Sequence, residues 1–392
     1  RGLGDVYKRQ GFAYVFAPKD SSIYPRFRFR QNFRWPRSEV GFNNYGWRGD
    51  DIEIQPAPNT IRIACLGAST TQNNPMEGFS YPEHLEHWLN LWAKKHWPDV
   101  KFECINAGRA GFTSSDIAAT FRQEVIPLQP DFAVYYAGFN EFAIIKMLDH
   151  IEEFPSVEDV RPGGFFSWSA IYRRIAIRFD MVTNEPDKEV RELQFPASIN
   201  ELQPDISSSD LPLMLPTILG NIDAIANDIN SIGGELTLCS FAMMIKDKML
   251  LDANRHRKLI RYWNSDQFSV VSYKDVRRMA DFQNRVLEKY ATEKNIPFLD
   301  VAGQMPLDPD LFTDGVHNYS AGVRLRAWIA FNQLLPVLKE KIEKGILPKQ
   351  KERLHENHPT LDSVTIFKVK LSCDCDTVQT DSIPCVNHFS EK

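Results

Sequence analysis

The chain has 392 residues, of which 43% are hydrophobic and 25% are charged. These fractions are close to the globular average and exclude a disordered, collagenous or fibrous chain. The 46 Lys and Arg residues against 51 Asp and Glu residues give a net charge of −5, which argues against a protein that binds nucleic acid through a basic face. Six cysteines are too few for a disulfide-dense secreted scaffold. No apolar run reaches the ~18 residues that span a bilayer.

The beginning of the chain, residues 1–54, is interpreted as an N-terminal arm. Residues 1–10 begin with Arg and resemble a translated sequencing adapter, so they are left out of the fold interpretation. A membrane anchor or export signal upstream of the given start stays open. Alternation over residues 27–30 predicts a half-buried strand. Five arginines of the arm either bind phosphates or anionic sugars or, as we favour, form a solvated face on an arm that packs against the main domain: Arg26, Arg28, Arg30, Arg34 and Arg37.

From residue 61 onward, short apolar runs alternate with helical segments. The runs that predict strands are 61–67, 101–108, 131–138, 233–242 and 296–301. The segments that predict helices are 81–97, 117–125, 217–229, 276–295 and 321–342. Continuous apolar strands separated by helices indicate βαβ units, and hence a parallel sheet that is buried on both faces.

Two regions do not fit this alternation. Residues 142–216 lie between the third and fourth strands and are far longer than a usual loop, with helical pieces expected near 168–180. Insertions of this length commonly bind or cover a substrate. Residues 346–392 are interpreted as a polar C-terminal tail that adds little to the core. The main domain is therefore expected to span residues 55–345.

Polar or glycine-containing motifs follow the predicted strands at their carboxyl ends, where parallel sheets bind their ligands. The first strand ends in G-A-S-T-T, which places Ser69 in a strand-to-helix turn. The second ends in N-A-G-R-A-G-F-T, which contains Gly111, and the third in G-F-N-E, which contains Asn140. Each motif alone has an ordinary structural explanation, as a helix cap or a tight turn.

The segment L-F-T-D-G-V-H-N follows the fifth strand and contains Asp314 and His317. Their spacing allows the carboxylate to reach one ring nitrogen of the imidazole, which leaves the other nitrogen free to face Ser69. A metal-site fragment and a salt bridge in a loop are alternative explanations of the same pair.

In combination, these motifs resemble the SGNH hydrolases, also called the GDSL esterase/lipase family. The four motifs stand in the family's order over roughly residues 60–340, and N-N-Y-G-W-R-G-D at 43–50 is similar to a lead-in that many such domains carry. Two residues depart from the family pattern: Ala68 stands where Asp is usual, and Glu141 follows Asn140 in place of Asp. These departures leave the subfamily and the substrate open.

The resemblance implies a flavodoxin-like, three-layer α/β/α sandwich with a five-stranded parallel sheet. It also implies roles for individual residues. Ser69 is expected to be the nucleophile, His317 the general base and acid, and Asp314 the residue that orients the imidazole. The backbone N–H groups of Ser69 and Gly111 and the side-chain amide of Asn140 are expected to form the oxyanion hole.

The expected function is therefore that of a serine esterase, which hydrolyses a carboxylic ester through an acyl-enzyme without a metal or an organic cofactor. The substrate class is a small-molecule or glycan ester, including O-acetyl or short acyl groups on a carbohydrate or lipid. One alternative is an O-acyltransferase that acts on an envelope polysaccharide, and another is a non-catalytic, glycan-binding domain. A periplasmic or membrane-anchored location is favoured over the cytoplasm, and the oligomeric state is left open.

Metal-binding patterns in the sequence are weak. His84 and His87 form H-x-x-H in a predicted helix, as do His355 and His358 in the tail, but neither pair has the Glu of H-E-x-x-H. A second set has a spacing that is uncommon for zinc: Cys373, Cys375, Cys385 and His388. We therefore expect no metal site. The three cysteines in predicted strands are expected to be buried thiols: Cys65, Cys104 and Cys239.

Overall fold

The computed structural model describes most of the chain between residues 11 and 371. The described ranges are 11–18, 24–33, 40–73, 78–141, 193–246, 249, 251–264, 271–349 and 364–371. Three sets of expectations lie outside these ranges: the helical pieces near 168–180, the histidine pair at 355–358 and the cysteines of the tail.

The centre of the molecule is a five-stranded parallel sheet with the strand order β4-β3-β5-β6-β7. The strands are β3 Thr60–Gly67, β4 Lys101–Gly108, β5 Phe132–Tyr136, β6 Glu235–Cys239 and β7 Phe298–Leu299. Numbered along the chain, this order is 2-1-3-4-5, which is the flavodoxin-like arrangement. The predicted α/β fold and its five parallel strands are confirmed.

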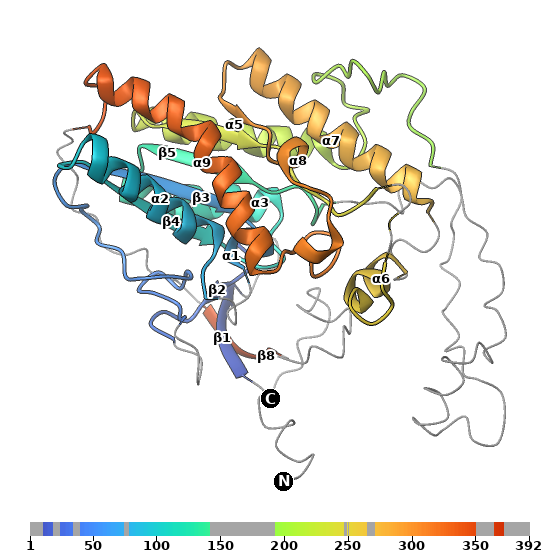
Figure 1. Cartoon of the computed structure of the whole chain (residues 1–392), viewed down its shortest axis with the longest axis horizontal. Helices are drawn as coiled ribbons and strands as arrows, with labels where there is room; N and C mark the ends of the chain where they lie inside the picture. Colours follow the sequence, from blue (N-terminus) through green and yellow to red (C-terminus); the bar gives the residue numbers. More distant parts are fainter. Residues whose placement is uncertain are drawn as a thin grey trace, which may run out of the picture.

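Helices cover both faces of this sheet and complete the three layers (Figure 1). One layer is formed by α2 Tyr81–His96 and α9 Ser320–Glu343, which pack against each other. The other layer contains α3 Ser114–Thr120, α5 Leu215–Ser231 and α7 Tyr273–Glu293. Shorter helices are α1 Ser69–Gln72, α6 Arg257–Trp263 and α8 Val301–Gln304.

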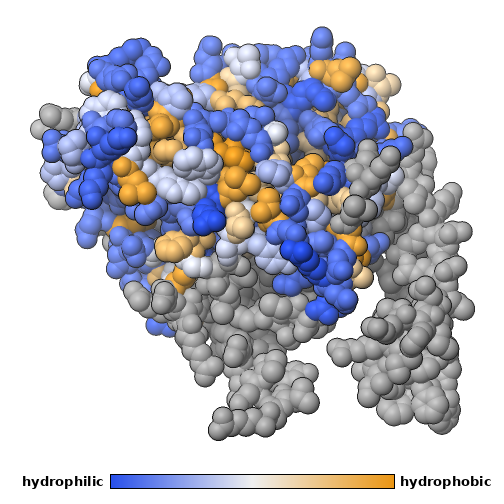
Figure 2. Space-filling model, in the orientation of Figure 1, coloured by the Kyte–Doolittle hydropathy of each residue, from blue (hydrophilic) through white to orange (hydrophobic). Residues whose placement is uncertain are grey.

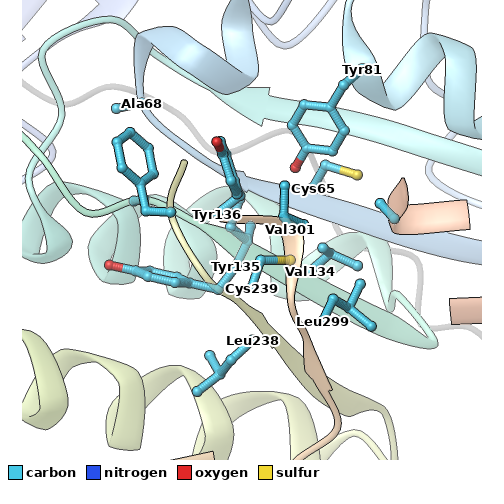
Figure 3. Close-up of a cluster of buried hydrophobic side chains, with 14 of the residues drawn as sticks. Cys65, Ala68, Tyr81, Val134, Tyr135, Tyr136, Leu238, Cys239, Leu299 and Val301 are labelled. Carbon is cyan, nitrogen blue, oxygen red and sulfur yellow. The ribbon is translucent and has the colours of Figure 1, made fainter. Parts of the chain in front are cut away.

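The core follows from the apolar patterns of these elements. All eight residues of β3 are buried, because it has a neighbouring strand on each side and a helical layer on each face. Figure 3 shows Cys65, Tyr81, Tyr136 and Cys239 in one cluster, contributed by β3, α2, β5 and β6. Cys65 and Cys239 are buried free thiols, as expected, and burial raises the pKa of Cys239. Cys104 is only partly buried.

A second, smaller sheet pairs the first and the last of the described segments. It consists of three antiparallel strands in the order β2-β1-β8, which lie together in Figure 1. The strands are β1 Gly11–Pro18, β2 Arg28–Phe29 and β8 Val364–Leu371. The strand expected over residues 27–30 is present as β2. The tail, which was interpreted as adding little, contributes β8, and β8 pairs with β1 along its whole length.

The arm packs against the main domain, as expected, but two of its arginines make this contact themselves and do not form a solvated face. Arg26 is paired with Asp116 at 2.6 Å, and Arg28 is paired with Glu124 at 2.8 Å. Both acids are almost completely buried. The arginines are therefore neither a solvated face nor free to bind an anion, and they attach the arm to the main domain. Arg34 and Arg37 lie outside the described ranges.

The surface facing the viewer is mixed. Figure 2 shows hydrophobic side chains near the centre of this face, over α9, with hydrophilic side chains around them. In the described part of the chain, none of the helices is both long enough and apolar enough to cross a bilayer.

Two leucines of α2 test how strongly the packing of this helix stabilises the fold. Leu89 is fully buried, whereas Leu91, on the outer face, is 54% exposed. Leu89→Ala should lower the free energy of unfolding by about 2–5 kcal/mol, because it removes buried methyl groups and leaves a cavity. Leu91→Ala should change it by no more than about 0.5 kcal/mol. Urea unfolding of both variants measures this, and equal losses would contradict the described packing of α2.

Candidate active site

Ser69 lies directly after β3, at the carboxyl edge of the sheet. It begins α1, and the Ala68 carbonyl accepts the first backbone hydrogen bonds of that turn from Thr71 and Gln72. The turn is compact because Gly67 has no side chain. A Cβ atom at Gly67 would lie 2.5 Å from the Tyr136 carbonyl oxygen and 2.1 Å from Thr71 Oγ1. The Ser69 side chain is consequently held at the sheet edge and is only partly buried.

Asp314 and His317 lie in the loop before α9. The Asp314 carboxylate accepts hydrogen bonds from the backbone N–H groups of Val316 and His317, at 2.9 and 2.8 Å. The same carboxylate binds His317 Nδ1, with Oδ2 at 2.8 Å. Because Asp314 occupies Nδ1, the other ring nitrogen faces away from it. His317 Nε2 lies 2.8 Å from Ser69 Oγ, so the structure brings the three residues together in one hydrogen-bonded chain.

The negative charge of Asp314 stabilises the protonated form of the His317 imidazole. Burial alone would lower the pKa of His317, but the negative charge and hydrogen bond of Asp314 outweigh it and raise that pKa above 6.5. Burial would likewise raise the pKa of Asp314, and the interactions with His317 and the backbone N–H groups lower it instead. The side chains of His317 and Asp314 remain 38% and 26% exposed, which leaves the imidazole accessible from the surface.

Asn140 and Phe112, of the loop of residues 109–112, line one cavity with Ser69. The loop follows β4, and Asn140 follows β5, so the topology places both at the carboxyl edge of the sheet. Asn140 Nδ2 donates to the Phe112 carbonyl at 2.8 Å. An amide nitrogen carries two hydrogens, so one remains for a substrate. The structure therefore places the Asn140 amide beside the 109–112 loop, as the sequence motifs require.

Two backbone N–H groups near Ser69 are available as donors. Within the described part of the chain, the N–H groups of Ser69 and Gly111 donate to no acceptor. Gly111 has a φ of +76°, a left-handed conformation that favours glycine. Both residues are only partly buried, and Ser69 is the first residue of α1, where backbone N–H groups have no partner within the helix. Such donors can bind an anionic ligand.

A cavity with mainly apolar walls lies next to Ser69. Ser69 and Asn140 line it, whereas Gly111 does not and adjoins it through its neighbour Phe112. The other lining residues are Ala68, Thr70, Ala137, Gly138, Phe139, Glu141, Phe241 and Val316. Glu141, one of the two departures from the family pattern, binds Ser114 Oγ at 2.5 Å, and burial raises the pKa of its carboxyl.

Sequence reasoning missed two residues that support the site. Gln72 accepts the Ala110 N–H on its side-chain oxygen at 2.7 Å, which connects α1 to the 109–112 loop. Arg326 of α9 is buried, donates to the Thr70 carbonyl at 2.9 Å and lies over the rings of Tyr81 and Tyr136. Gln72 is three residues after Ser69 and gives a weak local signal, but nothing local distinguishes Arg326 from a surface arginine of a helix.

His84, one of the two histidines of α2, packs against aromatic rings. His84 contacts the rings of Phe79 and Trp88, with centroid distances of 5.4 and 5.7 Å. Among the residues that the structure describes, no cluster of three or more His, Cys, Asp or Glu side chains could hold a metal ion.

Comparison with known proteins gives similarities among solved structures alone. No family model and no curated protein matches the chain. A GDSL-like lipase from Bacteroides thetaiotaomicron is 17% identical, covering 74% of this chain and 92% of its own, with a TM-score of 0.35. A lipase/acylhydrolase from Enterococcus faecalis is 15% identical, covering 74% and 100%, with a TM-score of 0.38. At these values the similarities carry no inference about the function of this chain.

The charge of Asp314 should be visible in the titration of His317. Asp314→Asn removes the negative charge that raises the pKa of the imidazole, so the midpoint should move to lower pH. Asp310→Asn is the matched control, because Asp310 pairs with His256 and Arg255 instead. NMR titration of the ring nitrogens measures both variants. An unchanged midpoint of His317 in Asp314→Asn, or an equal shift in Asp310→Asn, would contradict the pairing of His317 with Asp314.

Proposed function

We propose that this chain is a serine esterase that hydrolyses a carboxylic ester through an acyl-enzyme, with Ser69 as the nucleophile. The observation that carries the proposal is the hydrogen-bonded chain from Ser69 Oγ through His317 to Asp314. A serine hydroxyl is a poor nucleophile at neutral pH and needs an adjacent base, which the imidazole provides.

The first half of the reaction forms the acyl-enzyme. His317 Nε2 takes the proton of Ser69 Oγ as the oxygen attacks the ester carbonyl, and the π electrons of that carbonyl move to its oxygen. The protonated imidazole, stabilised by Asp314, then donates the proton to the leaving alcohol as the C–O bond breaks. In the second half, water repeats the attack on the acyl group, and Ser69 recovers its proton from His317.

The negative oxygen of each tetrahedral intermediate needs donors that are already in place. The N–H groups of Ser69 and Gly111 and the second hydrogen of the Asn140 amide are the candidates. Each such donor contributes about 2.7–4 kcal/mol to transition-state stabilisation in enzymes where one has been removed. These donors follow three different strands and lie at the same carboxyl edge of the sheet, which supports acyl transfer rather than a fortuitous serine–histidine contact.

The cavity walls support an ester with a compact acyl group. Phe112, Phe139 and Phe241 present apolar surface beside Ser69, and Glu141 is the one ionisable side chain among the described residues that line the cavity with Ser69. We therefore propose O-acetyl or other short acyl esters of a carbohydrate or lipid as the substrate class. A panel of esters that varies acyl length and alcohol tests this, and product analysis with free sugars separates hydrolysis from transfer to a sugar hydroxyl.

Ser69→Ala should abolish the hydrolysis of p-nitrophenyl acetate while the protein stays folded. Ser198→Ala is the control, because Ser198 is exposed and contacts Asp210 away from the site. A fluorophosphonate, which reacts only with an activated serine, should label the unmodified protein at Ser69 and should not label Ser69→Ala. Activity above background in Ser69→Ala, or an unlabelled wild-type protein, would refute the esterase assignment and favour a non-catalytic binding domain.

Asn140→Ala should lower kcat about 100-fold and leave KM almost unchanged, because an oxyanion donor acts mainly in the transition state. Steady-state kinetics with p-nitrophenyl acetate gives both constants. If only KM rises, the Asn140 amide binds the ground state of the substrate and is not part of an oxyanion hole.

A further inference from the structure

The N-terminal arm reaches the edge of the candidate active site. Two consecutive arm residues contact two consecutive residues of the 109–112 loop. Arg26 Nη2 donates to the Gly111 carbonyl at 2.7 Å, and the ring of Phe27 packs edge-on against the ring of Phe112 with a centroid distance of 5.0 Å. The contacts join segments that are 85 residues apart in the sequence.

Arg26 is fixed in this position by a buried acid. Its Nε and Nη2 atoms bind both carboxylate oxygens of Asp116 at 2.6–3.1 Å, and its backbone N–H binds the same carboxylate at 2.9 Å. Asp116 is fully buried and also accepts the N–H and hydroxyl of Thr113 at the start of α3. The guanidinium therefore has one well-defined orientation, in which the second hydrogen of Nη2 faces the Gly111 carbonyl.

The backbone of the 109–112 loop is held on both sides of the Gly111 N–H. The peptide group before it is fixed by the hydrogen bond from Ala110 N–H to Gln72, at 2.7 Å. The peptide group after it is fixed by the hydrogen bond from Arg26 to the Gly111 carbonyl. The peptide that carries the Gly111 N–H lies between these two. A glycine with positive φ has wide conformational freedom, so the direction of its N–H depends on such anchors.

We infer that Arg26 is a positioning residue for the reaction: through its hydrogen bond to the Gly111 carbonyl, the N-terminal arm aims the Gly111 N–H at the oxyanion. This inference rests on the proposed esterase function. It assigns the arm to the active site, because the loop that supplies one of the donors is held in place by a segment outside the central sheet.

Arg26→Gln should lower kcat for p-nitrophenyl acetate roughly 10- to 100-fold, because a donor displaced by about 1 Å loses much of its effect in the transition state. KM and the pH midpoint of the activity should stay almost unchanged, because Arg26 does not line the cavity with Ser69 and is not among the groups that shift the pKa of His317. Gln123→Ala is the matched control. Gln123 is exposed and holds the arm through hydrogen bonds with the Tyr24 carbonyl and with Arg28 Nη2, and neither contact involves the 109–112 loop.

Three kinetic results would overturn the inference: an unchanged kcat in Arg26→Gln, a rise in KM alone, or an equal loss of kcat in Gln123→Ala. The last result would mean that the arm matters only for stability. If Arg26→Gln does not fold, Asp116→Asn gives a second route. It keeps the shape of the acid but weakens the pairing that orients Arg26, and it should lower kcat in the same way.

Amide hydrogen exchange separates this inference from the esterase proposal. Exchange in peptides covering residues 109–113 should become faster in Arg26→Gln and should be unchanged in Gln123→Ala, whether or not the protein hydrolyses an ester. Unchanged exchange in Arg26→Gln would refute the anchoring contact itself. Failure of fluorophosphonate labelling in the unmodified protein would instead refute the esterase proposal, and the positioning role with it.

Discussion

The hydrogen bond between Ser69 Oγ and His317 Nε2 is the contact on which the proposed chemistry depends. It joins residues that are 248 positions apart, so it exists only in the folded chain. On one side, β3 and the compact turn at Gly67 fix Ser69. On the other side, Met244 N–H binds the Gly315 carbonyl at 2.8 Å and anchors the loop that carries His317. The parallel sheet and the loops at its edge thus set the distance between Ser69 Oγ and His317 Nε2, over which the proton is transferred.

Much of the fold and of the site was predictable, because the signals are local. A parallel strand that is buried on both faces must be apolar at nearly every position, so the run at 61–67 identifies β3 without reference to any partner. The motif residues follow their strands directly, and the topology alone brings Ser69, Asn140 and the 109–112 loop to one edge. The spacing of Asp314 and His317 also determines their mutual contact. These features required no knowledge of contacts between distant segments.

Other features were not predictable, because their partners are distant in sequence. The pairing of β1 with β8 links the two ends of the described chain, and neither strand carries a local mark of the other. Arg26 and Arg28 have the appearance of a surface charge run. Their acids, Asp116 and Glu124, lie on α3 and in the π-helical turn Phe121–Val125, about ninety residues away. A run of charged residues is exposed only if no buried residue of opposite charge pairs with it. The sequence contains such acids but does not show which of them pair with the arginines.

Residues that support the site lie outside its motifs because a glycine donor needs partners from other segments to orient it. An oxyanion donor on a glycine gains its orientation from neighbouring peptide groups, because glycine has no side chain to restrict it. Those peptide groups must be anchored from outside the loop, here by Gln72 and Arg26. A buried acid that binds a guanidinium through both oxygens holds that anchor more rigidly than a neutral contact would. A motif that contains a glycine therefore marks where a donor lies, while the residues that aim it are found elsewhere in the chain.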